Sequence, residues 1–395
     1  MITVTEKSKC SGCYACYNAC PKGCIQMIAD EEGFWYPQVN TENCIGCGVC
    51  EKVCPIIHKW QPDESSFTKT FAALNKNEEI RLQSSSGGIF TLIAESILEQ
   101  GGVVFGAAFS DDFRSVHHIY VDKKSALEKL RGSKYVQSNI GDTYQQAKRF
   151  LDDGRKVLFT GTPCQIGGLY SFLRKPYENL YTQDIICHGV PSPLVWEKYV
   201  EERENKAESK TQRMFFRHKK YGWKTFAVLF EFSNNKKYLK DLQEDPFMRA
   251  FLSNACLRPS CHACSFKSIE RQADITLADF WGVQSVMPDM DDDKGTSVIL
   301  IHSKKGQSLI DSIHDLIKIR DVDIAVVEKN NSAVNKSVAI SPNRQFLFES
   351  IESSSFDVIA NRIKPISKKA KVKRMLKRMK FGKYLISVKN RLRNH

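Results

Sequence analysis

The fold is decided by the stretch Cys10-Ser-Gly-Cys13-Tyr-Ala-Cys16-Tyr-Asn-Ala-Cys20-Pro21 and by its repeat Cys44-Ile-Gly-Cys47-Gly-Val-Cys50-Glu-Lys-Val-Cys54-Pro55. In both copies the four cysteines are separated by two, two and three residues, and a proline follows. This spacing lets three thiolates of one tight loop hold a [4Fe-4S] cubane, while the fourth is carried to the other cubane. We therefore assign one cluster to Cys10, Cys13, Cys16 and Cys54, and the second to Cys20, Cys44, Cys47 and Cys50.

A pair of zinc sites is the competing interpretation, because zinc also binds C-x2-C pairs. Zinc sites use four ligands each at different spacings, so a doubled four-cysteine run ending in proline favours iron-sulfur clusters. Cys24 lies outside the repeat and is expected to be a small buried side chain without a ligand role.

The chain is expected to stay in the cytoplasm. Its first nine residues are polar and lead directly into the cysteine cluster, unlike a secretory signal. No apolar run approaches the roughly 20 residues that a membrane-spanning helix needs. The fourteen cysteines would be kept reduced in that compartment, so metal ligation explains their clustering better than disulfides do.

After a polar linker at 61–66, the body alternates short apolar strands with amphipathic helices, which indicates a mixed α/β arrangement. The strands are expected at 71–74, 103–109, 116–121, 157–160, 180–186, 226–232 and 298–301, and the helices at 89–98, 166–173 and 193–200. The fold class is therefore α+β: a small dicluster ferredoxin domain at 1–60, a mixed α/β body and a basic helical tail.

Three loops of the body carry chemical signals. Ser84-Ser85-Ser86-Gly87-Gly88 precedes a helix and offers either a simple N-cap or a phosphate site built from backbone N–H groups. Gly161-Thr162-Pro163-Cys164 lies between a strand and a helix, where the helix N-terminus stabilises a thiolate; a buried cysteine in a tight turn is the alternative. Lys134 belongs to a polar loop, and its side chain is expected either beside an anionic cofactor or in solvent.

A third metal site is expected from Cys256, Cys261 and Cys264, which are separated by four and two residues. A closed site needs a fourth ligand, for which Cys187 is the first choice and Cys164 the reserve. A third [4Fe-4S] cluster is favoured over zinc because the chain already binds two such clusters.

The motifs SSSGGIFTLIA from Ser84, GSKYVQS from Gly132, GTPCQIGGL from Gly161, DIICHGVPSP from Asp184 and CHACSFKSIERQADITLADFWG from Cys261 resemble those of coenzyme F420 hydrogenase and dehydrogenase beta subunits. The resemblance covers roughly residues 1–330 and is to the bacterial form with an N-terminal dicluster ferredoxin domain. It implies a body of two parts, 67–160 and 161–330, that binds FAD. The implied FAD contacts are Ser85, Ser86, Gly87, Gly88, Lys134, Gly161, Thr162, Pro163 and Cys164.

The resemblance further implies an oxidoreductase that takes electrons from a low-potential donor such as ferredoxin. Iron-sulfur clusters transfer one electron at a time, whereas a hydride acceptor takes up two. A flavin can exchange either one or two electrons and therefore connects the two processes. The organic substrate is expected to be a small molecule, such as a sugar-derived one used in surface-polysaccharide synthesis. The alternative is an electron-relay subunit that serves a separate enzyme. No catalytic residue is assigned.

The formal charge of +13 is concentrated in the tail. From Arg362 to His395 there are fourteen Lys or Arg and no acidic residue, and the other 44 basic residues nearly equal the 45 acidic ones. Within the tail at 331–395, basic residues from Lys368 onward alternate with apolar residues at helical spacing, which favours docking on an anionic membrane surface. A solvated or partner-binding tail is the alternative, and nucleic-acid binding is not expected because the body is neutral.

Overall fold

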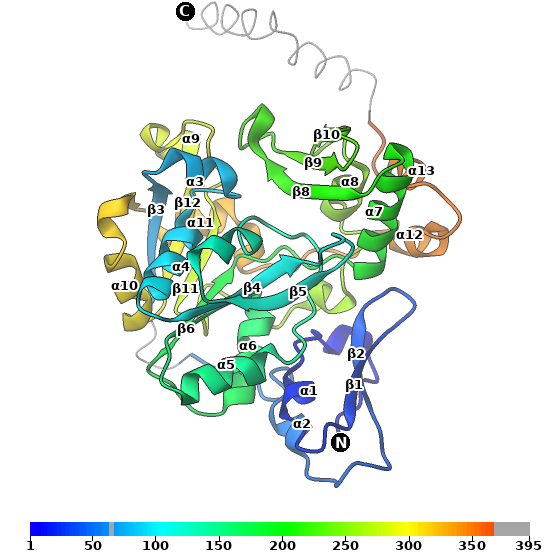
Figure 1. Ribbon diagram of the computed structural model, residues 1–395, viewed down its shortest axis with the longest axis vertical. Helices are drawn as coiled ribbons and strands as arrows, with labels where there is room; N and C mark the ends of the chain where they lie inside the picture. The colour runs from blue at the N-terminus through cyan, green and yellow to red at the C-terminus, as the bar shows by residue number, and fades with distance from the viewer. Residues whose placement is uncertain (63–66, 367–395) are drawn as a thin grey trace, which may run out of the picture.

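The computed structural model describes residues 1–62 and 67–366. The N-terminal domain contains the hairpin of β1 (Ile25–Ala29) and β2 (Trp35–Val39) and the short helices α1 (Ala15–Ala19) and α2 (Val49–Lys52). The repeated spacing produces a repeated backbone, since Tyr14 and Gly48 occupy equivalent positions and both have a φ of 66°. This left-handed conformation turns each loop into its helix. Figure 1 shows this domain at the lower end of the molecule.

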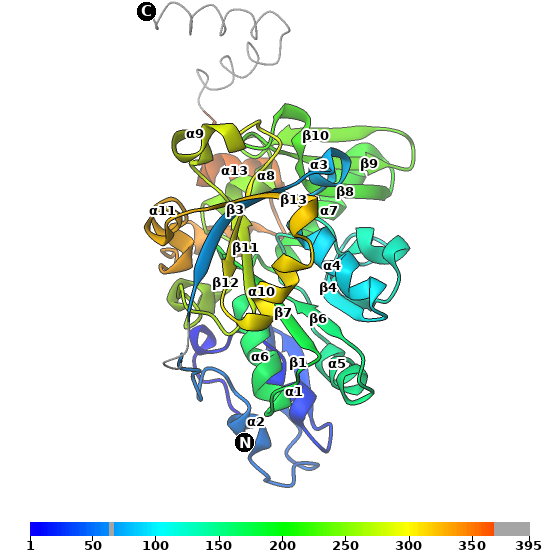
Figure 2. The same ribbon diagram turned by 90° about the vertical axis from the view of Figure 1, so that its left-hand side faces the viewer.

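The body is built on one eight-stranded sheet in the order β13-β3-β12-β11-β7-β6-β4-β5. The strands β11, β7, β6 and β4 are parallel, whereas β12 runs antiparallel to both β11 and β3. Figure 2 shows β3, β12 and β11 side by side above α6 and the ferredoxin domain. The strand bounds are β3 (Lys69–Asn75), β4 (Val103–Phe109), β5 (Val116–Val121), β6 (Val157–Thr160), β7 (Leu180–Ile185), β11 (Ile275–Asp279), β12 (Ser297–Ile301) and β13 (Ile317–Asp321).

Alternate residues of the central strands supply the two faces of the sheet. On β6, Leu158 packs into a cluster with α4 (Ile89–Glu99) and α10 (Lys304–Asp311), while Phe159 packs into another with α5 (Thr143–Asp152) and α6 (Pro163–Leu173). Both faces of β6 are buried, as expected for a parallel sheet covered on two sides. The body is thus a three-layer α/β arrangement, which confirms the expected fold class.

A second, helical lobe is attached to this sheet. Its three-stranded antiparallel sheet has the order β10-β9-β8 and packs with helices around the buried Trp196 and Phe247. The elements are α7 (Pro193–Ala207), β8 (Thr211–His218), β9 (Ala227–Phe232), β10 (Lys237–Asp241), α8 (Pro246–Leu252), α12 (Arg344–Ser350) and α13 (Phe356–Ile363). The remaining short helices α3 (Glu78–Gln83), α9 (Val283–Val286) and α11 (Ile324–Asn330) lie around β3 and β12.

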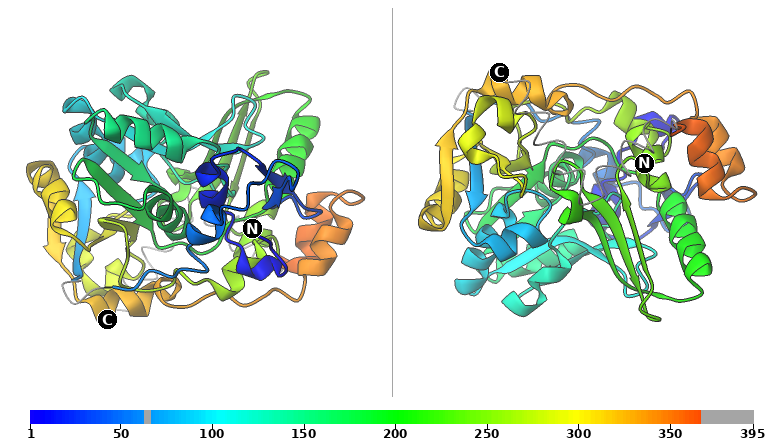
Figure 3. Two further views of the ribbon diagram at one scale, coloured as in Figure 1. Left: turned by 90° about the horizontal axis from the view of Figure 1, so that it is seen from below. Right: turned by 90° about the horizontal axis from the view of Figure 1, so that it is seen from above.

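The ferredoxin domain is seated on the body by its hairpin turn. The backbone of Gly33 lies against Leu194 at the start of α7, and Ser192 Oγ donates a hydrogen bond to the Glu32 carbonyl. The Glu32 carboxylate forms an ion pair with Arg344 of α12. Seen from below in Figure 3, the blue ferredoxin domain lies beside the orange C-terminal helices. The domain is therefore held between α7 and α12.

Within the proposed tail at 331–395, the segment up to 366 is packed: α12 and α13 contribute Leu347 and Ile359 to the core of the helical lobe. The basic, amphipathic segment from Lys368 onward lies outside the described residues. No helix in the two described ranges has the length and apolar character that spanning a membrane requires.

Candidate functional site: iron-sulfur cavities and an adjoining cleft

The loops singled out from the sequence meet at one edge of the main sheet. The strands β3, β6, β7 and β11 all run in the same direction, so their carboxyl ends lie together. The Ser84–Gly88 turn comes after β3 and α3, and the Gly161–Cys164 turn comes directly after β6. Cys187 follows β7, and Trp281 follows β11. The carboxyl edge of parallel strands is where ligands bind in open α/β sheets.

The two cysteine runs of the ferredoxin domain line two separate cavities. One is lined by Cys10, Cys13, Cys16 and Cys54, and we refer to it as the inner cavity. The other is lined by Cys20, Cys44, Cys47 and Cys50, and we refer to it as the distal cavity. In each case three cysteines come from one run and the fourth from the other run. The structure thus brings together the two sets that the spacing predicts.

Cys24 is buried and also lines the distal cavity, where its Sγ lies 3.4 Å from that of Cys20. Sequence reasoning gave this residue no place beside a cluster, because Cys24 lies outside the repeat. Its short separation from Cys20 was the available signal.

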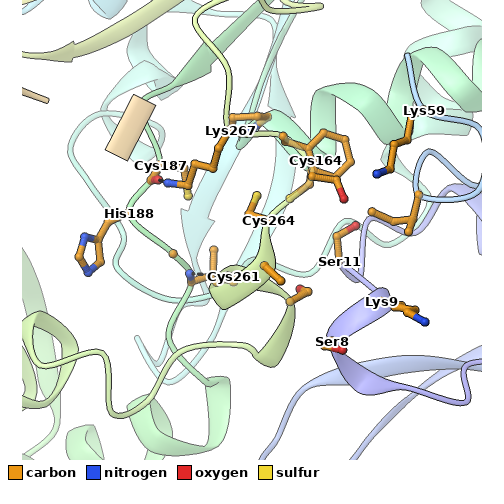
Figure 4. Close-up of a pocket in the computed structure, with 18 of the residues that line it drawn as sticks. Ser8, Lys9, Ser11, Lys59, Cys164, Cys187, His188, Cys261, Cys264 and Lys267 are labelled. Atoms are coloured by element: carbon orange, nitrogen blue, oxygen red, sulfur yellow. Dashed lines mark hydrogen bonds between the residues drawn. The ribbon is translucent and has the colours of Figure 1, made fainter. Parts of the chain in front are cut away.

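A third cavity of about 400 Å³ lies between the ferredoxin domain and the body, and we refer to it as the junction cavity. Figure 4 shows four cysteines on the body side and Ser8, Lys9, Ser11 and Lys59 of the ferredoxin domain opposite them. The four cysteines are Cys164, Cys187, Cys261 and Cys264. Lys267 donates hydrogen bonds to the carbonyls of Cys187 and Ala333, which fixes the loop that carries Cys187.

Cys256 does not line the junction cavity. Its side chain is fully buried in the core of the helical lobe, next to α8. The expected ligand set therefore changes: Cys164, held in reserve, stands where Cys256 was expected. The reason is local, since the backbone N–H of Ser192 bonds to the Cys256 carbonyl and places this residue under α7.

Three of the thiols that line the junction cavity, those of Cys164, Cys187 and Cys261, are poor anions when they are not bound to a metal. Burial raises the pKa of Cys187 to about 11 and that of Cys261 to about 12. Burial also raises the pKa of Cys164 well above its usual range, and the nearby Cys264 and Cys187 thiols raise it further. Four thiols that line one roomy cavity fit a cationic iron-sulfur core, which would stabilise their thiolates. Among the described residues, no group of three or more donor side chains converges on the point that a single ion would occupy.

A large cleft of about 570 Å³ adjoins the junction cavity at the carboxyl edge of the sheet. It contains six of the nine residues proposed as FAD contacts, namely Ser85, Ser86, Gly88, Lys134, Gly161 and Thr162. Gly87 does not line it: its N–H donates to Ser297 Oγ, and a Cβ there would lie 2.5 Å from the Ala73 carbonyl oxygen. Pro163 and Cys164 line the junction cavity instead.

The Ser84–Gly88 turn opens α4 without a side-chain cap, because its N-cap is Gly88 with a φ of 81°. The serine hydroxyls are engaged within the protein: Ser85 Oγ accepts from Ser133, and Ser86 Oγ donates to the Thr296 carbonyl. The groups available to an anion here are backbone N–H groups at the start of an eleven-residue helix.

Burial shifts the pKa of several titratable groups in the cleft, among them Lys134 and His118. Burial lowers the pKa of Lys134 to about 7, and its Nζ donates to the carbonyls of Lys129 and Arg131. Burial likewise lowers the pKa of His118 to about 4. The His118 ring lies between the Thr160 carbonyl and the Ser138 hydroxyl, each 2.9 Å away. His118 is therefore neutral near pH 7.

The far wall of the cleft combines an ion pair with an aromatic stack that the sequence did not reveal. The guanidinium of Arg217 pairs with Asp279 at 2.8 Å and also donates to the Tyr135 hydroxyl. The Trp281 ring stacks on Trp223 with centroids 5.0 Å apart and planes 6° apart. This wall offers flat apolar surface beside fixed polar groups, which suits a planar heteroaromatic ligand.

Three of the four cavities adjoin one another. The inner and junction cavities share Lys9, Ser11 and Ile56 as lining residues. The junction cavity and the cleft share the backbone segment from Cys187 to Val190. The distal cavity lies at the opposite end of the ferredoxin domain, next to the exposed Ile45.

Three family models match the chain. Residues 70–143 match the N-terminal part, and residues 154–325 the C-terminal part, of the coenzyme F420 hydrogenase/dehydrogenase beta subunits. Residues 3–59 match the 4Fe-4S dicluster domain. The first two are the two parts of one family, and together they cover more than half of the chain.

Individual proteins show the same relationship. The coenzyme F420-dependent sulfite reductase of Methanocaldococcus jannaschii is 26% identical over 197 residues, which cover 48% of this chain and 29% of that protein. One of the subunits of the F420H2 dehydrogenase of Methanosarcina mazei is 22% identical over 172 residues, which cover 41% of this chain and 48% of that protein. The match thus spans less than half the length of either relative.

A chain of the F420-reducing [NiFe] hydrogenase complex from Methanosarcina barkeri, solved as a xenon derivative, matches with a TM-score of 0.48 and 18% identity. That match covers 70% of this chain and 93% of the other. With both parts of the beta-subunit models and the dicluster domain matched, the chain belongs to the family of coenzyme F420 hydrogenase/dehydrogenase beta subunits and is an iron-sulfur electron-transfer protein.

Proposed function

We propose that the chain is an iron-sulfur flavoprotein oxidoreductase that moves electrons from a low-potential donor to FAD and on to an organic substrate. The observation that carries this proposal is the row of three cysteine-lined cavities ending at a large cleft. Each neighbouring pair from the inner cavity onward shares lining residues, so electrons can cross short distances inside the protein. FAD, when bound, supplies the exchange between one-electron and two-electron chemistry.

The proposed ligands follow the cavities. Cys20, Cys44, Cys47 and Cys50 would hold the distal cluster, and Cys10, Cys13, Cys16 and Cys54 the inner one. The third cluster would be held by Cys164, Cys187, Cys261 and Cys264. The exposed Cys47 and Ile45 make the distal cluster the one nearest to the surface, where a donor such as ferredoxin would deliver its electrons.

The cleft supplies the features that FAD requires. The uncapped start of α4 presents backbone N–H groups to the pyrophosphate, and Lys134 adds a cation nearby. The Trp281 face suits one of the flat rings of the cofactor. The segment from Cys187 to Val190 borders both the third cluster and the cleft, so the flavin ring belongs at that end.

The substrate would enter the part of the cleft that FAD leaves open. We propose a small, sugar-derived molecule and a role in surface-polysaccharide synthesis, with the chain acting in the cytoplasm or at the inner face of the membrane through its basic tail. An electron-relay subunit without its own substrate is the second candidate. It is favoured by the relative from Methanosarcina mazei, which is named as one subunit of a dehydrogenase.

The test is anaerobic purification followed by analysis of iron, sulfide and flavin together with a visible spectrum. About twelve irons and one FAD per chain are expected for three four-iron clusters and a flavin. About eight irons without flavin would leave a ferredoxin-headed relay and contradict the oxidoreductase proposal. Reduced ferredoxin should then bleach the flavin; an oxidised flavin after this addition would reverse the proposed direction of electron flow.

A further inference from the structure

Arg258 lies between the inner cavity and the junction cavity. Its backbone belongs to the junction side: its N–H donates to the Val190 carbonyl at 3.0 Å, and its carbonyl accepts from the N–H of Cys261 at 2.9 Å. The whole residue is buried, with 0% of its surface exposed. It is thus part of the loop that would hold the third cluster.

The side chain of Arg258 extends to the opposite side, into the ferredoxin domain. Its Nε donates to the Cys10 carbonyl at 2.9 Å, and its Nη2 donates to the Trp35 carbonyl at 3.0 Å. Its Nη1 donates to Gln137 Oε1 at 3.1 Å. The guanidinium also packs over the Tyr36 ring, 4.3 Å from its centre. The cation therefore contacts the backbone of an inner-cluster cysteine.

No carboxylate compensates this charge within the parts of the chain that the structure describes. The three acceptors of Arg258 are all neutral oxygens, and none of the ion pairs in the described ranges includes it. A buried cation without a counter-ion is strongly unfavourable. Four other buried guanidiniums among the described residues do have a carboxylate partner: Arg81 with Asp292, Arg203 with Glu202, Arg217 with Asp279 and Arg271 with Asp184. Arg258 needs a negative charge that protein side chains do not supply.

We propose that Arg258 is a positioning residue whose counter-ions are the inner and third clusters, and that it raises the reduction potentials of both. This inference rests on the proposed function. An iron-sulfur cluster bound by four thiolates is anionic, and one-electron reduction adds a further negative charge without any proton. A fixed buried cation stabilises the reduced state of each adjacent cluster, because electrostatic interactions are strong at low dielectric. The distal cluster lacks this neighbour, so electrons are drawn inward from it.

Two variants test the effect of the Arg258 charge, one by removing it and one by neutralising it with a carboxylate. Arg258→Gln deletes the cation, whereas Gln137→Glu keeps it and sets a carboxylate beside its Nη1 in a nearly isosteric position. Redox titration of the anaerobically purified holo-protein, followed by electron paramagnetic resonance, should show two of the three midpoint potentials lowered in both variants. The third potential should be unchanged. Arg258→Lys, which keeps a charge, should lower them less than Arg258→Gln does.

The matched control is Arg203→Gln. Arg203 is also buried and packs over an aromatic ring, that of Tyr199, but its guanidinium pairs with Glu202 of α7 and not with a cysteine-bearing loop. Its variant should keep all three wild-type potentials. Unchanged potentials in Gln137→Glu with full iron content would overturn the proposal, and so would an equal shift of all three clusters. If Arg258→Gln loses its iron and cannot be titrated, the potentials of Gln137→Glu still test the proposal. A wild-type protein without a third cluster or flavin would instead contradict the proposed function.

Discussion

Replacing Cys164 and Cys256 separately by alanine tests the ligand set of the third cluster. Cys164 lines the junction cavity with three other cysteines, whereas Cys256 is buried in the helical lobe. Cys164→Ala should therefore remove one of three clusters and lower the iron content from about twelve to about eight per chain. Cys256→Ala should keep about twelve irons and lower the free energy of unfolding by about 1 to 2 kcal/mol, because it leaves a small hole in a packed core.

The assay is iron and sulfide analysis of both variants after anaerobic purification, with far-ultraviolet circular dichroism to confirm that each is folded. Thermal unfolding reports the stability difference. The reasoning is refuted if Cys256→Ala loses four irons while Cys164→Ala keeps all of them. Retention of all iron in both variants would show that neither Cys164 nor Cys256 is needed to hold the third cluster.

Three other predictions each rest on a single feature. Burial lowers the pKa of Lys134 to about 7, so Lys134 of the free protein is neutral above pH 7. Binding of the anionic FAD phosphates beside a charged Lys134 then requires that Lys134 take up a proton. The Kd for FAD should therefore rise by up to about tenfold per pH unit above 7. Lys134→Met should bind FAD more weakly at pH 6 and show a flatter profile between pH 6 and 9 by flavin fluorescence, and equal slopes would contradict this role. In the distal cavity, Cys20→Ala should lose up to about four irons, whereas Cys24→Ala should keep all of them; the opposite result would exchange their roles. The full chain should float with anionic vesicles but not with neutral ones, and removing residues 367–395 should abolish the flotation with anionic vesicles. Flotation that is unchanged by the truncation would rule out membrane docking through this segment.

Much of the fold could be predicted from local sequence patterns. The strands expected at 103–109, 116–121 and 157–160 are present with those bounds, because each is a continuous apolar or alternating run between polar turns. The antiparallel strands β8, β10 and β13 were not predicted. Several of their charged residues, such as Arg213, Lys240 and Lys318, face solvent at an edge, so the pattern of these strands resembles that of a polar loop.

The candidate site was harder to predict from the sequence than the fold, because its residues meet only after the sheet has formed. Cys256 has a ligand-like spacing to Cys261, yet the chain between them turns Cys256 into the core and Cys261 into the cavity. The Arg217–Asp279 pair joins positions 62 residues apart. No periodic pattern reports such a contact, since it depends on the order of strands in the sheet.

The seat of the ferredoxin domain has a consequence for biosynthesis. Glu32 is made early and its partner Arg344 near the end of the described chain, so the ion pair between them cannot form until α12 has left the ribosome. Until then the hairpin turn is in place on one side only, against α7. During synthesis from the N-terminus, the ferredoxin domain therefore gains its contact with α12 only after every strand of the main sheet has been made.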